Sequence, residues 1–103
     1  MPAQGYVAVL VIELHFPYAG SLKAKRQELS SIKAQLRTRL GVAVSETGHQ
    51  DLWQRGTLTA ALTGGSLRRL QEAVDEVERW VLARCPEGAT VERLIASVED
   101  LRG

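Results

Sequence analysis

The chain has 103 residues, of which 45% are hydrophobic, and its formal net charge is +1 at pH 7. A chain of this length supports one domain with one core, which buries roughly 60–65% of the surface of the extended chain. The near-neutral charge excludes an overall field that would draw the protein onto nucleic acid or a membrane, so any basic surface has to be local.

Cys85 is the single cysteine, which excludes an intramolecular disulfide and a thiolate-based zinc site within one chain. The most apolar run, Tyr6 to Ile12, is far shorter than the roughly 18–20 residues that span a bilayer. No basic segment with a small-residue cleavage site precedes it. We therefore expect a cytoplasmic protein without an export signal, a cofactor or a membrane partner.

The first half of the chain predicts a strand and a long helix. Val7–His15 is rich in β-branched residues, and both of its faces are largely apolar, as in the central strand of a sheet. Ser21 is a predicted N-cap. Apolar residues then recur at helical spacing over Leu22–Leu40 until Gly41 ends the helix.

The second half predicts a hairpin, a second helix and a last strand. Val42–Val44 and Gly56–Thr63 have the composition of strands and are close enough in sequence to pair as neighbours. Ser66 is the predicted N-cap of a helix with one apolar stripe, which ends near Cys85. Thr90–Val98 supplies the fourth strand.

This order indicates an α+β domain over residues 1–103 with the ferredoxin-like βαββαβ plan, in which an antiparallel four-stranded sheet carries two helices on one face. Right-handed crossovers place the first strand between the third and the fourth. The helices cover only one of the two apolar rows of that strand. We therefore expect a homo-oligomer to form through the open face of the sheet.

The same plan gathers polar residues at one end of the sheet. The first two strands run parallel, so their carboxyl ends meet where the third strand and the first helix begin. The residues expected there are His15, Lys23, Lys25, Arg26, Glu46, His49, Asp51, Trp53 and Arg55. Cys85, in contrast, is expected at the opposite end of the molecule from both histidines.

The first predicted helix carries six basic residues against Glu28 alone. At about 100° per residue, Arg26, Ser30, Lys33 and Arg37 form one row beside the apolar stripe, so the cations can reach one partner together. The candidates for binding RNA phosphate or another anion are Lys23, Lys25, Arg26, Lys33, Arg37 and Arg55. The alternative is a solvated helix whose long basic side chains only cover the edges of the core.

The segment HQDLWQRGT, His49–Thr57, joins the two strands of the expected hairpin. Its candidates for contact with a partner are His49, Asp51, Trp53 and Gln54. Trp53 either folds back as a local anchor or forms the centre of an interface.

Catalytic and metal-binding alternatives have less support. Glu46, His49 and Asp51 carry metal-binding side chains, and folding adds His15, but their spacing matches no established ligand motif. The chain has no asparagine to orient water as in acylphosphatases, and Thr57–Thr63 has no aromatic residue to stack RNA bases as in RRM domains. We therefore assign no catalytic residue and no metal site, and a metal-dependent hydrolase ranks third among the functions considered.

Two stretches carry a family resemblance: VIELHFPYAGSLKAKR near the start, and Glu46 followed by HQDLWQR. On these, and on the order of elements, the chain resembles the YlxP-like family of small bacterial proteins, domain of unknown function 503. The resemblance implies a ferredoxin-like fold. It also implies a link to translation, because the genes of the family frequently lie beside those of translation initiation factor two and ribosome-binding factor A.

The family pattern covers Ser21, Leu22, Lys23, Lys25, Arg26, Glu46, Asp51, Leu52, Trp53, Gln54 and Arg55, all present here. The leading hypothesis is a non-enzymatic accessory of translation or ribosome assembly, which docks on RNA phosphates or a ribosomal protein through the basic helix and the Trp53 loop. The second is a homo-oligomeric regulatory module whose polar end binds a small anion.

Overall fold

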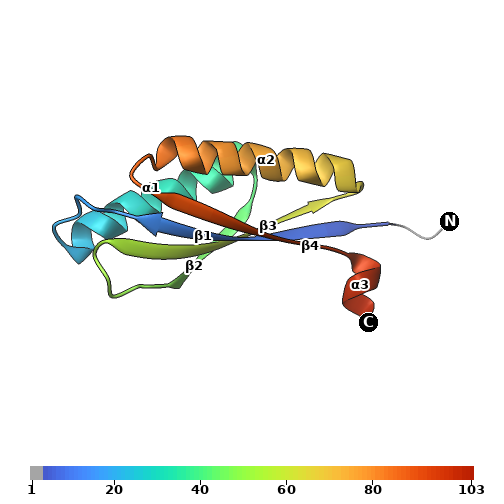
Figure 1. Cartoon of the computed structure of the whole chain (residues 1–103), viewed down its shortest axis with the longest axis horizontal. Helices are drawn as coiled ribbons and strands as arrows, with labels where there is room; N and C mark the ends of the chain where they lie inside the picture. Colours follow the sequence, from blue (N-terminus) through green and yellow to red (C-terminus); the bar gives the residue numbers. More distant parts are fainter. Residues whose placement is uncertain (1–3) are drawn as a thin grey trace.

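The computed structural model describes residues 4–103, and the expected elements follow one another in the expected order (Figure 1). The first three residues of the expected domain lie outside the described residues. The strands are β1 (Tyr6–His15), β2 (Ala43–Gly48), β3 (Arg55–Gly64) and β4 (Ala89–Ser97). The helices are α1 (Leu22–Leu40), α2 (Leu67–Arg84) and α3 (Val98–Arg102).

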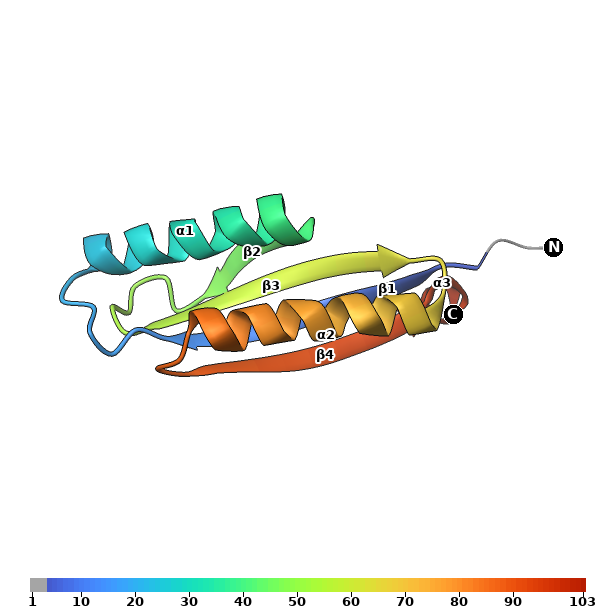
Figure 2. The same cartoon turned by 90° about the horizontal axis from the view of Figure 1, so that it is seen from above.

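The four strands form one sheet in the order β2-β3-β1-β4, and each neighbouring pair is antiparallel. β1 and β2 therefore run parallel, with β3 between them. Helices α1 and α2 lie on one face of the sheet, α1 toward β2 and α2 over β1 and β4 (Figures 1 and 2). This arrangement confirms the ferredoxin-like α+β fold expected from the sequence.

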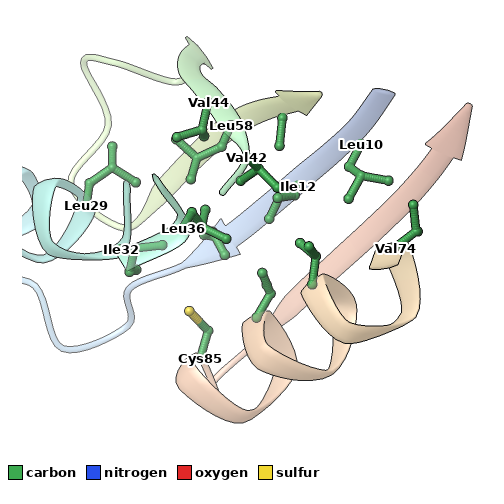
Figure 3. Close-up of a cluster of buried hydrophobic side chains, with 14 of the residues drawn as sticks. Leu10, Ile12, Leu29, Ile32, Leu36, Val42, Val44, Leu58, Val74 and Cys85 are labelled. Carbon is green, nitrogen blue, oxygen red and sulfur yellow. The ribbon is translucent and has the colours of Figure 1, made fainter. Parts of the chain in front are cut away.

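The core lies between this face and the two long helices. Along β1 every second side chain points toward the helices, and Ala8, Leu10, Ile12 and Leu14 are at most 1% exposed. They form one cluster with apolar residues of β2, β3, α1 and α2 (Figure 3). Burial of each large apolar side chain in such a cluster contributes about 1.5–3 kcal/mol, so the leucines and the isoleucine of this row stabilise the sheet by several such contributions.

The ends of the long helices follow the sequence signals. The Ser21 hydroxyl accepts a hydrogen bond from the N–H of Ala24 at 3.1 Å, and the Ser66 hydroxyl accepts one from Arg69 at 3.2 Å. Gly41 ends α1 in the left-handed conformation, with φ of 65°, which glycine adopts without strain. No helix among residues 4–103 is long and apolar enough to cross a membrane.

The last strand ends one residue earlier than predicted, because Val98 begins the short helix α3. Ser97 and Asp100 form a capping box, in which each side chain accepts a hydrogen bond from the other residue's N–H at 3.0 Å. The spacing Ser-x-x-Asp is a known sequence signal for the start of a helix, but the preceding apolar run suggested a continuing strand.

The other face of the sheet is not covered by α1 or α2, as expected. Val7, Val9 and Val11 of β1 lie on it and are partly exposed. A row across all four strands consists of Ala43, Ala61, Val9 and Leu94, which pair directly in this order. The neighbouring rows contain both apolar and polar residues, namely Val7, Val11 and Ala96 beside Ser45, Thr59, Thr63 and Glu92. The face is therefore mixed, and its use by a homo-oligomer remains a prediction.

Candidate functional site

The carboxyl ends of β1 and β2 meet the start of β3 and the first turn of α1 at one end of the molecule (Figure 2). We call this the loop end, because the β2–β3 loop, residues 49–54, lies there. Hydrogen bonds fix this loop from two sides of the sheet, and both sets include His49, which was expected at this end.

On the side covered by the helices, the Lys25 side chain is fully buried. Its Nζ donates a hydrogen bond to the carbonyl oxygen of His49 at 2.6 Å and lies 3.5 Å from that of Gln50. The Glu46 carboxylate is 3.9 Å away. A buried ammonium is tolerated only when it is paired and hydrogen-bonded, so these contacts tie the loop to α1.

On the open side, Thr57 connects His49 with Glu13. The Thr57 hydroxyl donates to Oε2 of Glu13 at 2.8 Å, so its oxygen is free to accept from Nδ1 of His49 at 2.9 Å. Thr57 is 8% exposed, so its hydroxyl depends on these two partners. The chain of hydrogen bonds holds His49 with φ of 57°, which is uncommon for a residue other than glycine.

Sequence reasoning missed Glu13 and Thr57 as members of this site. A signal was present: Glu13 is the first charged residue in the apolar rows of β1, and β1–β3 pairing places it directly opposite Thr57. The pairing register was needed to find the contact, because the two residues are far apart in sequence.

The residues considered for a metal site diverge. Glu46 points to Lys25 on the covered side, whereas His49 contacts Thr57 on the open side, and Asp51 is exposed in the loop. Residues 4–103 hold no cluster of three or more histidine, cysteine, aspartate or glutamate side chains arranged to bind a metal. The hydrogen bonds of Lys25 and Thr57 to His49 order the hairpin at this end.

The loop itself presents apolar side chains outward. The Phe16 N–H donates to the carbonyl oxygen of Gln54 at 2.9 Å, and the Gln54 side chain lies 3.4 Å from the carbonyl oxygen of Pro17. Directly before Gln54 in the loop, the side chains of Leu52 and Trp53 are 48% and 52% exposed. A shallow depression on this surface is lined by Asp51, Leu52, Trp53, Gln54 and Arg55.

The basic residues of α1 are placed differently from one another. Lys23 and Arg26 are exposed, Lys33 is partly exposed, and the Arg37 guanidinium donates to the carbonyl oxygen of Val44 in β2 at 2.8 Å. Lys25, expected among the anion-binding residues, points into the protein, and its ammonium group is hydrogen-bonded to the loop. The row of Arg26, Lys33 and Arg37, which we call the basic row, therefore lies beside the β2 edge without Lys25.

Cys85 does not lie where the sequence analysis expected it. Because α2 runs back along the sheet, its carboxyl end returns to the loop end, and Cys85 lines a hollow of about 230 Å³ together with His15. The prediction that it lies opposite both histidines was wrong. Burial raises the pKa of the Cys85 thiol, and the nearby positive charge of Arg84 opposes this only in part. The thiol is therefore protonated near neutral pH and is a poor nucleophile.

These features define a ferredoxin-like α+β domain with a rigidly held hairpin loop beside a basic helix. The profile of the family described as "Protein of unknown function (DUF503)" matches residues 7–99. The "Uncharacterized protein YlxP" of Bacillus subtilis (strain 168) is 36% identical over 81 residues, which are 79% of this chain and 84% of that protein. The chain belongs to this YlxP-like DUF503 family, which confirms the resemblance found in the sequence.

Among solved structures, the "De novo designed protein Foldit4" is similar, with a TM-score of 0.54 over 89% of this chain and 96% of that one. Its sequence is 12% identical, so this likeness concerns the fold alone.

Lys25→Met should separate the role of the ammonium from that of its apolar stem. We expect the variant to lose about 1–3 kcal/mol of unfolding free energy, because the charge-assisted hydrogen bond from the Lys25 ammonium is lost and only the N–H of Leu52, at 3.2 Å, still donates to the carbonyl oxygen of His49. Urea denaturation measures the loss. The matched control is Lys23→Met on the exposed neighbouring position, which should change stability by less than about 0.5 kcal/mol. Equal effects of the two substitutions would contradict the loop-holding role of Lys25.

Thr57→Val should break the link between His49 and Glu13 while keeping the volume of the side chain. We expect it to lower the unfolding free energy by about 1–3 kcal/mol and to speed amide hydrogen exchange in residues 49–54. Thr57→Ser keeps the hydroxyl and should preserve slow exchange in the loop. If the serine variant exchanges as fast as the valine variant, the hydroxyl does not hold the loop.

Proposed function

We propose that the protein is a non-enzymatic accessory of translation or ribosome assembly that binds RNA phosphates through the basic row, Arg26, Lys33 and Arg37. The observation that carries this proposal is the segregation of charge on α1. The three cations share one flank of the helix, while its only acidic residue, Glu28, lies about half a turn away. There Glu28 pairs with Arg84 of α2 at 3.0 Å. The row is thus free of acidic neighbours on its own helix.

The loop extends this surface. Lys25 lies in the first turns of α1 and holds the carbonyl oxygen of His49, so the loop is fixed beside the start of the basic row. Arg55, at the beginning of β3, adds an exposed cation at this end. Trp53 adds a half-exposed aromatic ring, on which an unpaired base can stack.

The chemistry of this surface favours binding with little sequence preference. Phosphate contacts position a protein on nucleic acid but carry no direct sequence information. Residues 57–63 of β3 supply no aromatic platform for bases. A net charge of +1 leaves no overall field, so affinity should depend on the local cations and fall steeply with salt.

Arg26→Gln combined with Lys33→Gln tests the basic row. We expect weaker binding to RNA hairpins of two unrelated sequences and to bacterial ribosomal particles. The slope of log affinity against log salt should flatten by about one to two units, because each phosphate contact contributes about 0.7–0.9. Fluorescence anisotropy with labelled hairpins over a salt series measures this slope.

The matched control is Arg39→Gln combined with Arg79→Gln, which removes two exposed cations away from the row and changes the net charge equally. It should leave the slope unchanged. If both double variants flatten the salt slope equally, the change reflects net charge and not the basic row. If the unmodified protein binds neither RNA nor ribosomal particles, the proposal is refuted. Binding of free phosphate alone would favour the anion-binding alternative.

Trp53→Ala tests the loop. Because the ring is half exposed, its loss should reduce affinity for single-stranded RNA by about 1–3 kcal/mol without changing the salt slope. Leu52→Ala, with a similarly exposed neighbour, should have a much smaller effect. A lowered melting temperature with unchanged RNA affinity would identify Trp53 as a local anchor of the hairpin.

A further inference from the structure

The two edges of the sheet are built differently. The β2 edge is short, with six residues, and its register against β3 shifts between Glu46 and Gly48. The Arg37 guanidinium also occupies the carbonyl oxygen of Val44 at 2.8 Å. Short strands, irregular register and basic side chains are the features that prevent a sheet edge from pairing with another chain.

The β4 edge lacks these protections. It has nine residues without proline, and it pairs with β1 from Leu14↔Ala89 to Tyr6↔Ser97 without a register shift. Its only basic residue, Arg93, is directed to α2, where Asp75 at 2.7 Å and Glu78 at 3.2 Å neutralise it. A long, regular strand whose cation is neutralised within its own chain is suited to strand pairing.

We infer that β4 pairs antiparallel with β4 of a second copy of this chain, so that the two sheets become one continuous sheet. A two-fold axis perpendicular to the sheet keeps the helix-covered faces on the same side. Residues that lie directly opposite each other in an antiparallel pair point to the same face of the sheet. The two-fold axis must therefore pass beside one residue of β4, which then lies opposite its own copy, and not between two residues.

The central positions give three candidate registers. An axis at Glu92 places two carboxylates opposite each other. An axis at Arg93 brings together two clusters that each hold one guanidinium and two carboxylates, so both registers oppose like net charges, which is unfavourable. An axis at Leu94 places this leucine, 51% exposed in the single chain, against its copy, and Glu92 opposite Ala96. The side chains therefore select Leu94 as the centre.

Pairing through β4 continues the apolar row of the open face into the second copy. The apolar row of Ala43, Ala61, Val9 and Leu94 ends at the β4 edge, and the two-fold axis joins it to the same row of the partner copy. Helix α3 leaves β4 toward the face opposite to α1 and α2, so it does not extend along the line of the edge (Figure 1).

Helix α2 carries two exposed leucines on the flank toward β4. Leu82 is seven residues from Asp75, and Leu67 is eleven residues from Glu78, so both share the flank whose carboxylates hold Arg93. They are 47% and 41% exposed and lie near opposite ends of α2. The two-fold axis makes the α2 helices of the two copies run antiparallel. The end of α2 that carries Leu82 in one copy therefore lies beside the end that carries Leu67 in the other.

This dimer does not depend on RNA binding. The basic row lies beside β2, at the edge of the sheet opposite to β4. RNA binding and self-association can therefore be tested and lost separately.

Sedimentation equilibrium over about three decades of protein concentration tests the dimer, which should have twice the 11.3 kDa mass of the chain. Leu94→Lys should raise the dissociation constant by about tenfold or more, since it removes an apolar contact and sets two like charges at the axis. Ala61→Lys is the control: it places a charge on the open face, away from the edge, and should leave the dimer intact. Circular dichroism establishes that both variants are folded.

A monomer at all concentrations would overturn the inference. So would a dimer that Ala61→Lys disrupts, whether or not Leu94→Lys also disrupts it, because Ala61 lies on the open face away from the β4 edge and this result indicates sheets stacked through their open faces. Capture of an extended segment of another protein without formation of a dimer would overturn it as well.

Cross-linking tests the register. In a Cys85→Ala background, Leu94→Cys should form a disulfide-linked dimer, since residues directly opposite in an antiparallel pair have Cβ atoms about 4.5–5.5 Å apart. Glu92→Cys should not link to itself but should link to Ala96→Cys when the two variants are mixed. Self-linkage of Glu92→Cys as fast as that of Leu94→Cys would exclude the register centred on Leu94.

Discussion

β1 pairs along almost its whole length with β3 on one side and β4 on the other, and its inner row is covered by both long helices. Successive side chains of a strand point to opposite faces, so a shift of one residue would turn Leu10, Ile12 and Leu14 away from the helices. The buried area of this row holds the register. That register then determines which residues of β3 and β4 lie opposite each residue of the open face.

The geometry of the loop end follows from this register. Pairing places Glu13 opposite Thr57, and the Thr57 hydroxyl holds His49 from the open side. From the covered side, the buried Lys25 ammonium needs the carbonyl oxygen of His49, because an unpaired buried charge would be strongly unfavourable. Two independent requirements thus fix one loop residue, and they explain why Trp53 can remain half exposed without losing its position.

The basic row and the regular β4 edge lie on opposite sides of the sheet. The basic row runs beside the protected β2 edge, whereas the regular β4 edge lies across the sheet from it. A near-neutral chain gains a cationic surface in this way by sorting its charges: Glu28 pairs with Arg84, and Asp75 and Glu78 pair with Arg93. Net charge alone therefore gives little information about what such a protein binds, and the arrangement of ion pairs gives more.

Periodicity and capping residues in the sequence determined the strands, the two long helices and their caps, because these depend on neighbours within one or two turns. The connection rules of the fold determined that the loop end would gather residues far apart in sequence. Only the tertiary structure decided which side chains are buried and which residues contact one another. Lys25 resembles its basic neighbours in sequence, yet its position on α1 faces the interior. Cys85 was expected far from His15, but α2 reverses direction and brings it back to the same end. The partnership of Glu13, Thr57 and His49 depends on strand register and on the loop closing over it, which no local pattern specifies.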